Sequence, residues 1–305
     1  MILVLTPNPA LDITYEIAQP VRAHGEHRVA RGREAAGGKG VNVARVLAAL
    51  GTGTILAGPL GGGTGDRLRQ LLGADGAMPR EAWTRIDGET RRTVTAVDPG
   101  GATAFNELGP ALTATEIDRV LADARAAAAH ADLAVISGSL PPAWAPALLG
   151  ELVARLRADG TRVIVDTSGP ALLDAARAGA DLLKPNLREV RDATGLADPL
   201  AACRALIDLG AGAVLGSSGP DGMLAVTAEQ AWRSVPPRID GNPTGAGDAA
   251  VAAAAHALTR GADLPQILRE AVATSASAVT QPVAGQIDLD LAQQLLRTLT
   301  VTEMP

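Results

Sequence analysis

The segment Asn242–Asp248, which reads Asn-Pro-Thr-Gly-Ala-Gly-Asp, has residue types that can bind an anion and take up a proton. Gly245, Ala246 and Gly247 precede an apolar stretch that predicts a helix over 249–258, so their N–H groups lie at the positive end of a helix dipole. Such a helix start binds anions. Asp248 would then lie beside the anion, where it can accept a proton from an attacking hydroxyl. The alternative is that Asp248 only charges the helix N-terminus.

A second glycine-rich stretch, residues 37–42, offers a cation and an amide in Lys39 and Asn42. Its glycines allow a ligand to approach the backbone closely. It is not a Walker A loop, because Arg33 stands where the first glycine belongs and Gly40 follows the lysine. The first strand is also not followed by a GxGxxG dinucleotide fingerprint. We interpret the stretch as a ligand loop, with an ordinary turn as the alternative.

Asn186 and Glu189 are three residues apart after an expected strand. This spacing suits a hydrated Mg²⁺, which uses few protein ligands. Without its neighbours, Glu189 would more often be a carboxylate at a helix start. His24 and His27 lack a third ligand, so we do not interpret them as a metal site.

Lysine and asparagine are scarce in this chain, which has 25 arginines but only two lysines, Lys39 and Lys184. Asn42, Asn186 and Asn242 are among only five asparagines. Both lysines and these three asparagines fall in the motifs above or directly beside them. We therefore expect these residues to be ones that other residue types cannot replace.

Composition limits the class of protein. The 305 residues are 47% hydrophobic, which is enough for one sizeable core with a small appendage. A net charge of −6 without a basic cluster argues against nucleic acid as a partner. No apolar run is long enough for a membrane span, and the first residues lack a signal peptide, so we expect a cytoplasmic protein. Cys203 is the single cysteine, which excludes a disulfide framework.

The pattern of strands and helices predicts an α/β protein. Residues 13–17 and 92–97 alternate like half-exposed strands and predict a small separate sheet. From residue 110 onward, strands and helices alternate, which predicts a mainly parallel sheet with helices on both faces. The expected strands are 2–6, 54–57, 133–137, 162–166, 181–184 and 212–217, with a hairpin over 223–235. The expected helices are 41–50, 64–72, 114–130, 143–158, 170–178 and 199–209, with three more beginning near 245, 264 and 288.

Four polar loops follow strands of the expected parallel sheet: residues 137–142, 166–169, 184–189 and 217–222. Parallel sheets bind ligands beyond the carboxyl ends of their strands. We therefore predict one composite site that these loops share.

Taken together, the motifs resemble those of the PfkB (ribokinase-like) sugar kinases. The resemblance covers nearly the whole chain in the right order and rests on the segments 8–12, 37–44, 137–141, 184–189, 217–222 and 245–248. Gly25-Glu26-His27-Arg28, together with Lys39, is most similar to the branch of 1-phosphofructokinases and tagatose-6-phosphate kinases.

The resemblance implies a ribokinase-like three-layer α/β/α fold with a mainly parallel central sheet and a small β-sheet lid. By this resemblance, residues 1–12, 36–83 and 104–305 form the core that binds nucleotide and sugar. Residues 13–35 and 84–103 form the lid. In many relatives the lid is also a dimer interface, so we expect a homodimer through it.

The resemblance also implies residue roles. Asp248 is the expected general base, and the amides of Gly245, Ala246 and Gly247 are the expected anion hole. The sugar would be held by Asp12, Gly37, Gly38, Lys39 and Asn42, and its existing phosphate by Arg91 and Ser139. Asn186 and Glu189 would organise Mg²⁺, with Glu189 binding it through water. Lys184, Ser217, Gly219 and Gly222 would line the nucleotide.

We therefore expect an ATP- and Mg²⁺-dependent kinase of a phosphorylated ketohexose. A second phosphate on the sugar needs cations, for which the candidates are Arg28, Lys39, Arg91 and Arg92. The resemblance points first to fructose 1-phosphate, with tagatose 6-phosphate and fructose 6-phosphate as alternatives. A non-catalytic phosphosugar sensor is a further alternative, which the intact Gly-Ala-Gly-Asp segment disfavours. A dinucleotide oxidoreductase is disfavoured because the fingerprint is missing.

Overall fold

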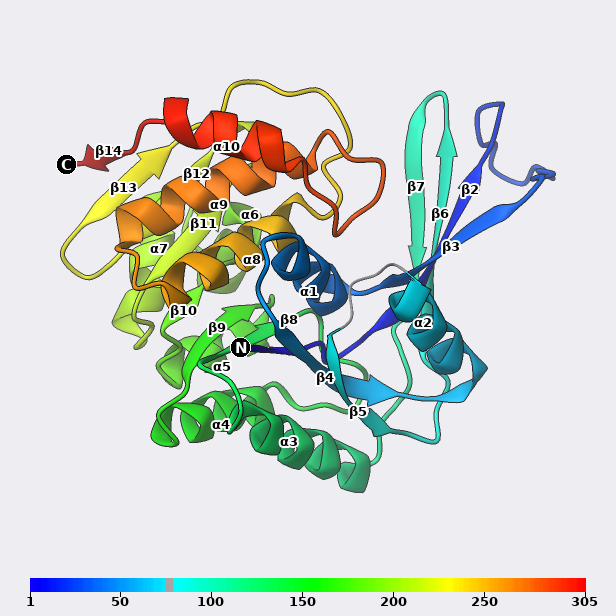
Figure 1. Cartoon of the computed structure of the whole chain (residues 1–305), viewed down its shortest axis with the longest axis horizontal. Coiled ribbons are helices and arrows are strands. Elements are labelled where there is room, and N and C mark those ends of the chain that lie inside the picture. Colours follow the sequence, from blue (N-terminus) through cyan, green and yellow to red (C-terminus); the bar gives the residue numbers. More distant parts are fainter. Residues whose placement is uncertain (75–78) are drawn as a thin grey trace.

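The computed structural model describes residues 1–74 and 79–305, which form a large α/β body and a small projecting sheet (Figure 1). Within these residues the large sheet has ten strands, in the order β14-β13-β12-β11-β10-β9-β8-β1-β4-β5, and the small sheet has four, in the order β3-β2-β6-β7. The strands are β1 (Ile2–Leu5), β2 (Ala10–Glu16), β3 (Gly32–Gly37), β4 (Thr54–Leu60), β5 (Arg80–Arg85), β6 (Arg91–Asp98), β7 (Gly101–Asn106), β8 (Leu133–Ser137), β9 (Arg162–Asp166), β10 (Leu182–Leu183), β11 (Val214–Ser217), β12 (Met223–Val226), β13 (Ala231–Ser234) and β14 (Thr302–Met304). The helices are α1 (Lys39–Ala49), α2 (Gly62–Ala74), α3 (Ala114–Ala128), α4 (Pro146–Ala158), α5 (Pro170–Arg177), α6 (Leu187–Thr194), α7 (Pro199–Asp208), α8 (Ala246–Thr259), α9 (Leu264–Ala278) and α10 (Leu289–Thr298).

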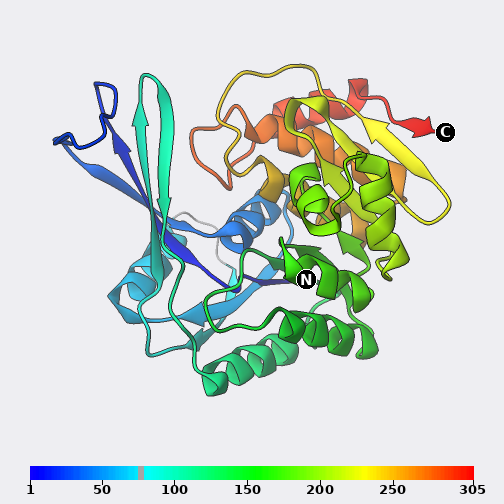
Figure 2. The same ribbon diagram turned by 180° about the vertical axis from the view of Figure 1, so that it is seen from behind.

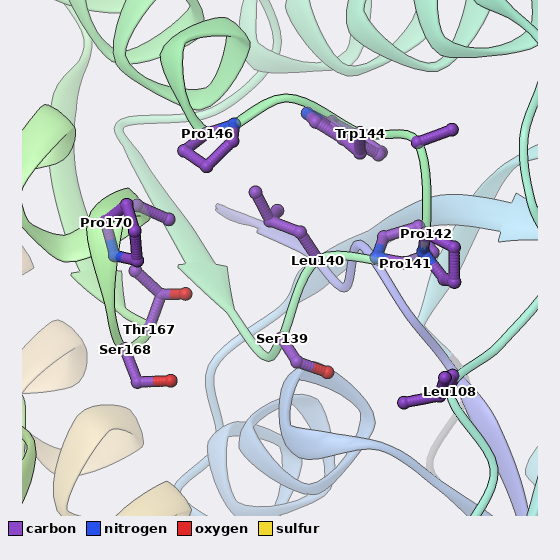
Figure 3. A pocket seen from close by; sticks show the side chains of 12 residues that line it. Leu108, Ser139, Leu140, Pro141, Pro142, Trp144, Pro146, Thr167, Ser168 and Pro170 are labelled. Carbon is purple, nitrogen blue, oxygen red and sulfur yellow. The ribbon is translucent and has the colours of Figure 1, made fainter.

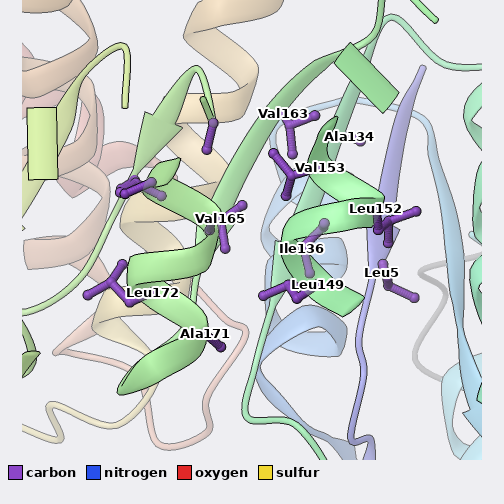
Figure 4. Packing of buried hydrophobic residues seen from close by; sticks show 14 of the residues in the cluster. Leu5, Ala134, Ile136, Leu149, Leu152, Val153, Val163, Val165, Ala171 and Leu172 are labelled. Atoms are coloured by element: carbon purple, nitrogen blue, oxygen red, sulfur yellow. The ribbon is translucent and has the colours of Figure 1, made fainter. Parts of the chain in front are cut away.

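The centre of the large sheet is parallel and buried on both faces, as the apolar strand sequences predicted. Successive side chains of β1 enter different cores, because side chains alternate across a strand. Leu3 and Leu5 pack in the cluster that includes residues of α3, α4 and α5, and part of this cluster is shown in Figure 4. Ile2 and Val4 pack in the cluster that includes residues of α1, α8 and α9. The sheet is therefore the middle of three layers.

One edge of the large sheet is antiparallel. The hairpin expected over 223–235 is present as β12 and β13, which pair from Met223–Ser234 to Val226–Ala231. The sequence did not predict β14, which adds to β13, or β5, which adds to β4 at the opposite edge. Both are short edge strands whose pairing partners are distant in sequence, so local periodicity does not mark them.

The small sheet contains the two strands that alternation predicted. β2 and β6 pair in parallel, with Asp12 opposite Thr93. β3 and β7 flank them and were not predicted. The small sheet and the expected lid ranges have different bounds: β2 begins at Ala10, β3 ends at Gly37 and β7 ends at Asn106, whereas Thr84 and Arg85 pair with β4 in the large sheet. Figures 1 and 2 show the small sheet extending away from the large body.

Two helix predictions need correction. The helix expected over 143–158 begins only at Pro146, because Ala143 has a left-handed φ of 69° and proline is favoured at a first helical position. The helix α6 was not predicted, because its eight residues are mostly polar and its start was interpreted as a ligand segment.

Within the described residues, every helix is too short or too polar to span a bilayer.

The polar loops converge as predicted. β8, β9, β10 and β11 are consecutive neighbours in the large sheet and run parallel. The loops that follow these strands therefore lie side by side at one edge. The start of α8 lies against α1, so the two glycine-rich helix starts face the same region.

Candidate active site

The start of α8 has the geometry of an anion site. Gly245 is the N-cap residue with a left-handed φ of 85°, and a Cβ there would lie 2.8 Å from the Cβ of Ala284. Glycine is thus required by both conformation and space. The N–H of Ala246 donates to the carbonyl of Pro243 at 3.2 Å. This amide, a predicted member of the anion hole, therefore already has a hydrogen-bond acceptor. Within the described chain, the N–H groups of Gly245 and Gly247 make no backbone hydrogen bond and can bind an anion.

Asp248 lies in the first turn of α8 and is only 6% exposed. Burial raises its pKa to about 7, and the carboxylate of Asp166 adds to this rise. A hydrogen bond from Asn42 and the charges of Lys39 and Lys184 oppose it. A carboxyl group that titrates near neutrality can both accept and release a proton. The environment therefore favours the general-base interpretation over a helix-charge role.

Lys184 places a buried cation beside this helix start. It follows β10 and is 3% exposed, and within the described chain its ammonium makes no hydrogen bond or ion pair. A Cβ on Gly247 would lie 3.3 Å from the Lys184 Nζ atom, so the ammonium lies next to the uncovered amides. The Lys184 Nζ atom is not among the fully buried unpaired atoms of the described chain, so it keeps access to solvent. A bound anion would supply the missing partner to both groups.

Lys39 does not extend freely toward a ligand. Its Nζ lies 3.3 Å from Oδ2 of Asp166 and 4.0 Å from Oε1 of Glu189. Burial opposes its charge, but Asp166, Glu189 and Asp248 outweigh this effect and raise the pKa of Lys39 above its usual value. The structure therefore places this predicted sugar contact among the carboxylates beside Asp248.

Asp166 is a site residue that sequence analysis missed. It ends β9, is 1% exposed, and accepts a hydrogen bond from Ser137 at 3.1 Å as well as the ion pair from Lys39. The available signal was its position at the end of a parallel strand, in one of the loops predicted to share the site. An aspartate in a loop is too common for this signal to single it out.

Asn186 and Glu189 form a capping box at the start of α6. The Asn186 side chain accepts from the N–H of Glu189 at 2.8 Å, and Glu189 Oε2 accepts from the N–H of Asn186 at 2.9 Å. The helix-start interpretation is thus observed. The other carboxylate oxygen, Glu189 Oε1, lies 4.0 Å from Lys39 Nζ. The capping box therefore uses only one of the two carboxylate oxygens. Among the described residues, no three acidic, histidine or cysteine side chains group as metal ligands.

Asp12, Gly37 and Thr93 form one side of the expected sugar loop. The Thr93 hydroxyl donates to Asp12 Oδ1, and burial raises the pKa of Asp12 despite this bond and the nearby Arg91. A Cβ on Gly37 would lie 2.0 Å from Asp12 Oδ2, so only glycine leaves room for this carboxylate. Gly38 adopts a left-handed φ of 97° directly before α1.

Arg91 and Ser139 are brought together by Asn8. Arg91 Nε donates to the carbonyl of Asn8 at 3.1 Å, and the Asn8 side chain donates to the Ser139 hydroxyl at 3.4 Å. Arg91 Nη1 also donates to the carbonyl of Glu107. Asn8 was not predicted as a site residue, although it belongs to a segment on which the resemblance rests.

The structure divides the predicted cationic cluster. Arg91 and Arg92 are adjacent in β6 and point to opposite faces of the small sheet. Arg92 donates to the Thr64 hydroxyl of α2 at 3.1 Å, away from Asp12. Arg28 is exposed on the loop between β2 and β3. Arg91 is therefore the member of the set that stays beside Asp12.

The turn after β11 contains the three remaining predicted residues. Ser217 bridges to Asn186, which places the turn beside the start of α6. Gly219 has a left-handed φ of 55°, and a Cβ on Gly222 would lie 2.2 Å from the carbonyl oxygen of Ser234. The N–H of Ser218 donates to the carbonyl of Gly222 at 2.8 Å and closes the turn. We call residues 217–222 the glycine turn.

A cavity of about 420 Å³ lies next to Ser139, on the side of α4 and α5 (Figure 3). Its lining residues are all uncharged: Leu108, Ser139, Leu140, Pro141, Pro142, Ala143, Trp144, Pro146, Thr167, Ser168, Pro170 and Ala171. A cavity without charged groups cannot provide the base or the cations described above. The proposed chemistry therefore belongs to the group of side chains at the starts of α1, α6 and α8.

Comparisons with known proteins agree with this geometry. A family profile described as "pfkB family carbohydrate kinase" matches residues 6–290. The chain is 36% identical to the 1-phosphofructokinase of Rhodobacter capsulatus, over 100% of this chain and 98% of that protein. It is 37% identical to the ATP-dependent 6-phosphofructokinase isozyme 2 of Mycobacterium tuberculosis, over 95% and 87% of the two chains. It is also similar to the crystal structure of phosphofructokinase-2 from Escherichia coli in complex with substrates and products, with a TM-score of 0.87, 30% identity and coverage of 97% and 98%.

Proposed function

Because the chain belongs to the pfkB family of carbohydrate kinases, we propose that it transfers the γ-phosphoryl group of ATP to a phosphorylated ketohexose, with fructose 1-phosphate as the preferred acceptor. The observation that carries this proposal is the buried group of Asp248, Lys184 and Gly247. It combines a proton acceptor that titrates near pH 7 with a cation and an amide that lack partners. The proposed product is fructose 1,6-bisphosphate.

In the proposed reaction, the sugar hydroxyl oxygen bonds to the γ-phosphorus while the bond from that phosphorus to the bridging oxygen of ADP breaks. The hydroxyl proton moves to Asp248. Negative charge develops on the phosphoryl oxygens and the departing ADP, and Lys184 with the amides of Gly245 and Gly247 stabilises it. Burial keeps water from competing with the sugar hydroxyl.

The residues present fit a hydrated Mg²⁺, which keeps several waters and needs one or two carboxylates. Asp166 Oδ2 and Glu189 Oε1 lie 3.3 Å and 4.0 Å from Lys39 Nζ, so two carboxylates are close enough to share one hydrated ion. We propose that Glu189, with Asp166, holds the ion mainly through water. When bound, Mg²⁺ supplies charge neutralisation to the phosphates.

The sugar lies, in this proposal, between the start of α1 and the small sheet. Asp12, Asn42 and the backbone of residues 37–38 hold its hydroxyls. Arg91 and Ser139 bind its existing phosphate, because Asn8 already brings them together. The nucleotide lies along the glycine turn, with Ser217, Gly219 and Gly222 close to its phosphates or ribose.

We also propose that the small sheet closes over the sugar as a lid and carries a homodimer interface. β7 is exposed along its whole length, including Phe105 at 62%. An exposed aromatic residue on an edge strand is typical of an association surface. The related phosphofructokinase-2 from Escherichia coli has been described in a tetrameric inhibited form.

Fructose 6-phosphate is the second candidate acceptor, because the Mycobacterium tuberculosis relative is a 6-phosphofructokinase with similar identity. The deciding experiment compares kcat/KM for fructose 1-phosphate, fructose 6-phosphate, tagatose 6-phosphate, fructose and ribose, since discrimination between substrates lies in that ratio. We expect fructose 1-phosphate to give the highest value. A clear preference for an unphosphorylated sugar would contradict the role of Arg91 and the assignment to a phosphosugar kinase.

A further inference from the structure

A second cavity, of about 250 Å³, adjoins the glycine turn. It is lined by the start and last turn of α6, by the start of α7, by the glycine turn and by strands β12 to β14. Of its lining residues, Leu224 and Met304 pack with the apolar cluster on the face of the sheet that α7 covers, and Met223 packs with the cluster on the other face. Asp248 and the start of α8 belong to the opposite face. The cavity, which we call the rear cavity, is lined by none of Asp248, Lys184 and Gly247, although it shares Gly222 with the proposed nucleotide site.

The rear cavity combines an apolar floor with balanced charges. Leu187, Leu200, Leu224 and Met304 provide the floor. Two guanidinium groups, of Arg191 and Arg233, and two carboxylates, of Asp198 and Asp221, line the same small space.

These four charges are not paired with each other. Within the described chain, the Arg191 side chain makes no hydrogen bond or ion pair, and neither does the Asp221 carboxylate. Arg233 donates to the backbone carbonyl of Asp221 at 3.2 Å, and Asp198 caps α7 by accepting from the N–H of Ala201 at 2.7 Å. All four residues are exposed, so their charged groups are accessible to a ligand that carries both signs and could form charge-assisted hydrogen bonds with it.

We propose that the rear cavity binds a zwitterionic α-amino acid with an apolar side chain. The carboxylate would meet Arg191 and Arg233, the ammonium would meet Asp221 and the remaining oxygen of Asp198, and the side chain would cover the leucine floor. The size agrees with this class, because ligand sites for larger molecules usually occupy about 300–1,000 Å³. A nucleotide is too large, and a simple sugar would leave the apolar floor unmatched.

The cavity touches both segments that the proposed nucleotide site uses. Leu187 follows Asn186 directly, and Ser218 and Gly222 belong to the glycine turn. Ser217 pairs with Asn186, so the two segments are joined where they meet the cavity. A ligand held here changes the freedom of both segments, and the affinity for ATP changes with it. This coupling rests on the proposed function, whereas binding to the cavity does not.

Isothermal titration calorimetry on the whole protein, without ATP or sugar, tests the binding. The probes are L-leucine and L-phenylalanine, with 4-methyl-2-oxopentanoate as an analogue without the ammonium and 3-methylbutylamine as one without the carboxylate. We expect one site per chain for at least one of the amino acids and an affinity about tenfold or more weaker for each analogue, since each loses a charged hydrogen-bonding group. The absence of saturable binding by both amino acids would overturn the proposal, and equal binding of the keto acid would overturn the zwitterion assignment.

Two variants and a matched control locate the site. Arg191→Ala should weaken amino-acid binding about tenfold or more, and Leu200→Trp should abolish it by filling the cavity without changing its charge. Arg188→Ala removes an arginine from the same helix that is 90% exposed and paired with Asp192 outside the cavity, so binding should be unchanged. Equal binding by all three variants would place the ligand elsewhere and contradict the proposal.

Initial-rate kinetics then test the coupling. A saturating amino acid should change the KM for ATP about fivefold or more, with little change in the KM for the sugar. The effect should be lost in Arg191→Ala and kept in Arg188→Ala. An unchanged KM for ATP in the presence of measured binding would overturn the coupling. Binding that persists in a protein without kinase activity would contradict only the proposed function.

Discussion

Asn42 Nδ2 donates a 2.8 Å hydrogen bond to Oδ2 of Asp248, although the two residues are 206 positions apart. The bond joins the first turns of α1 and α8 and fixes one carboxylate oxygen, which leaves the other free to face a ligand. Asn42 Oδ1 is buried and has no partner, so the amide still has an acceptor to offer. The Asn42 amide therefore orients the candidate base, while its own buried oxygen lies against Gly285.

The first prediction concerns the base itself. Asp248→Asn should lower kcat by on the order of 10²–10⁴, because only the proton acceptor is removed while the shape of the site is kept. Binding titrations with sugar and ATP should stay close to those of the wild type. Asp290→Asn, which changes an exposed acid in the first turn of α10, is the control. Near-normal turnover of Asp248→Asn would mean that Asp248 is not the base and only interacts with the dipole of α8.

The same substitution should change stability in a way that depends on pH. The pKa of Asp248 is raised by burial from 3.8 to about 7, so the folded state binds the proton more tightly than the unfolded state. This favourable contribution is present at low pH and is lost as pH rises through about 7. Asp248→Asn should therefore be more stable than the wild type at pH 8, on the order of 2–4 kcal/mol, with a smaller difference at pH 5.5. Urea unfolding at both values measures this, and a difference independent of pH would contradict the raised pKa.

The pH–rate profile should report both Asp248 and Asn42. For the wild type, kcat/KM should rise with pH through about 7, because the base must be ionised. Asn42→Ala removes a hydrogen bond that lowers the pKa of Asp248, so the acidic limb should move to higher pH. Asn42→Asp should move it further, because a second carboxylate disfavours ionisation of the first. If the three proteins differ only in the maximal kcat/KM and not in the pH of the midpoint, Asn42 does not set the pKa of Asp248 and its role is limited to sugar binding.

The fourth prediction separates the two roles of Glu189. Gln can also serve in a capping box, so Glu189→Gln keeps the start of α6 but removes the charge. The Mg²⁺ concentration for half-maximal rate should rise more than the sugar KM does, as a Mg²⁺ series at saturating sugar would show. Glu116→Gln makes the same change in the capping box of α3 and is the control. An identical Mg²⁺ dependence for the wild type and Glu189→Gln would mean that Glu189 serves only in the capping box of α6.

The fifth prediction tests the lid. Hydrogen exchange in residues 13–35 and 84–103 should slow when the phosphosugar binds, because closure of the small sheet over the sugar excludes water. Strands β8 and β9 are buried in both states and should change little, which makes them the internal reference. Unchanged exchange in both lid segments would limit the small sheet to a structural or dimer role.

Local patterns in the sequence determined much of this protein. Alternating strands and helices predicted the parallel sheet, because burial on both faces requires continuous apolar strands. The Gly-Ala-Gly-Asp segment predicted a helix start with uncovered amides and a first-turn carboxylate, because these are properties of a few consecutive residues. The capping box of Asn186 and Glu189 was also visible as the helix-start alternative. Family roles were assigned from the motifs that resemble those of the family, although the segment 90–93, which contains Arg91, departs from the family's pattern.

Tertiary structure decided the contacts between these segments. Sequence could not show that Lys39 pairs with Asp166, that Asn42 bonds to Asp248, or that Arg92 turns away from Arg91 toward Thr64. It also could not show that burial brings the pKa of Asp248 to about 7. Each of these depends on distances between atoms that are remote in the chain, and on how much water the packed layers exclude. Charge pairing and desolvation are properties of the folded arrangement, so no local pattern encodes them.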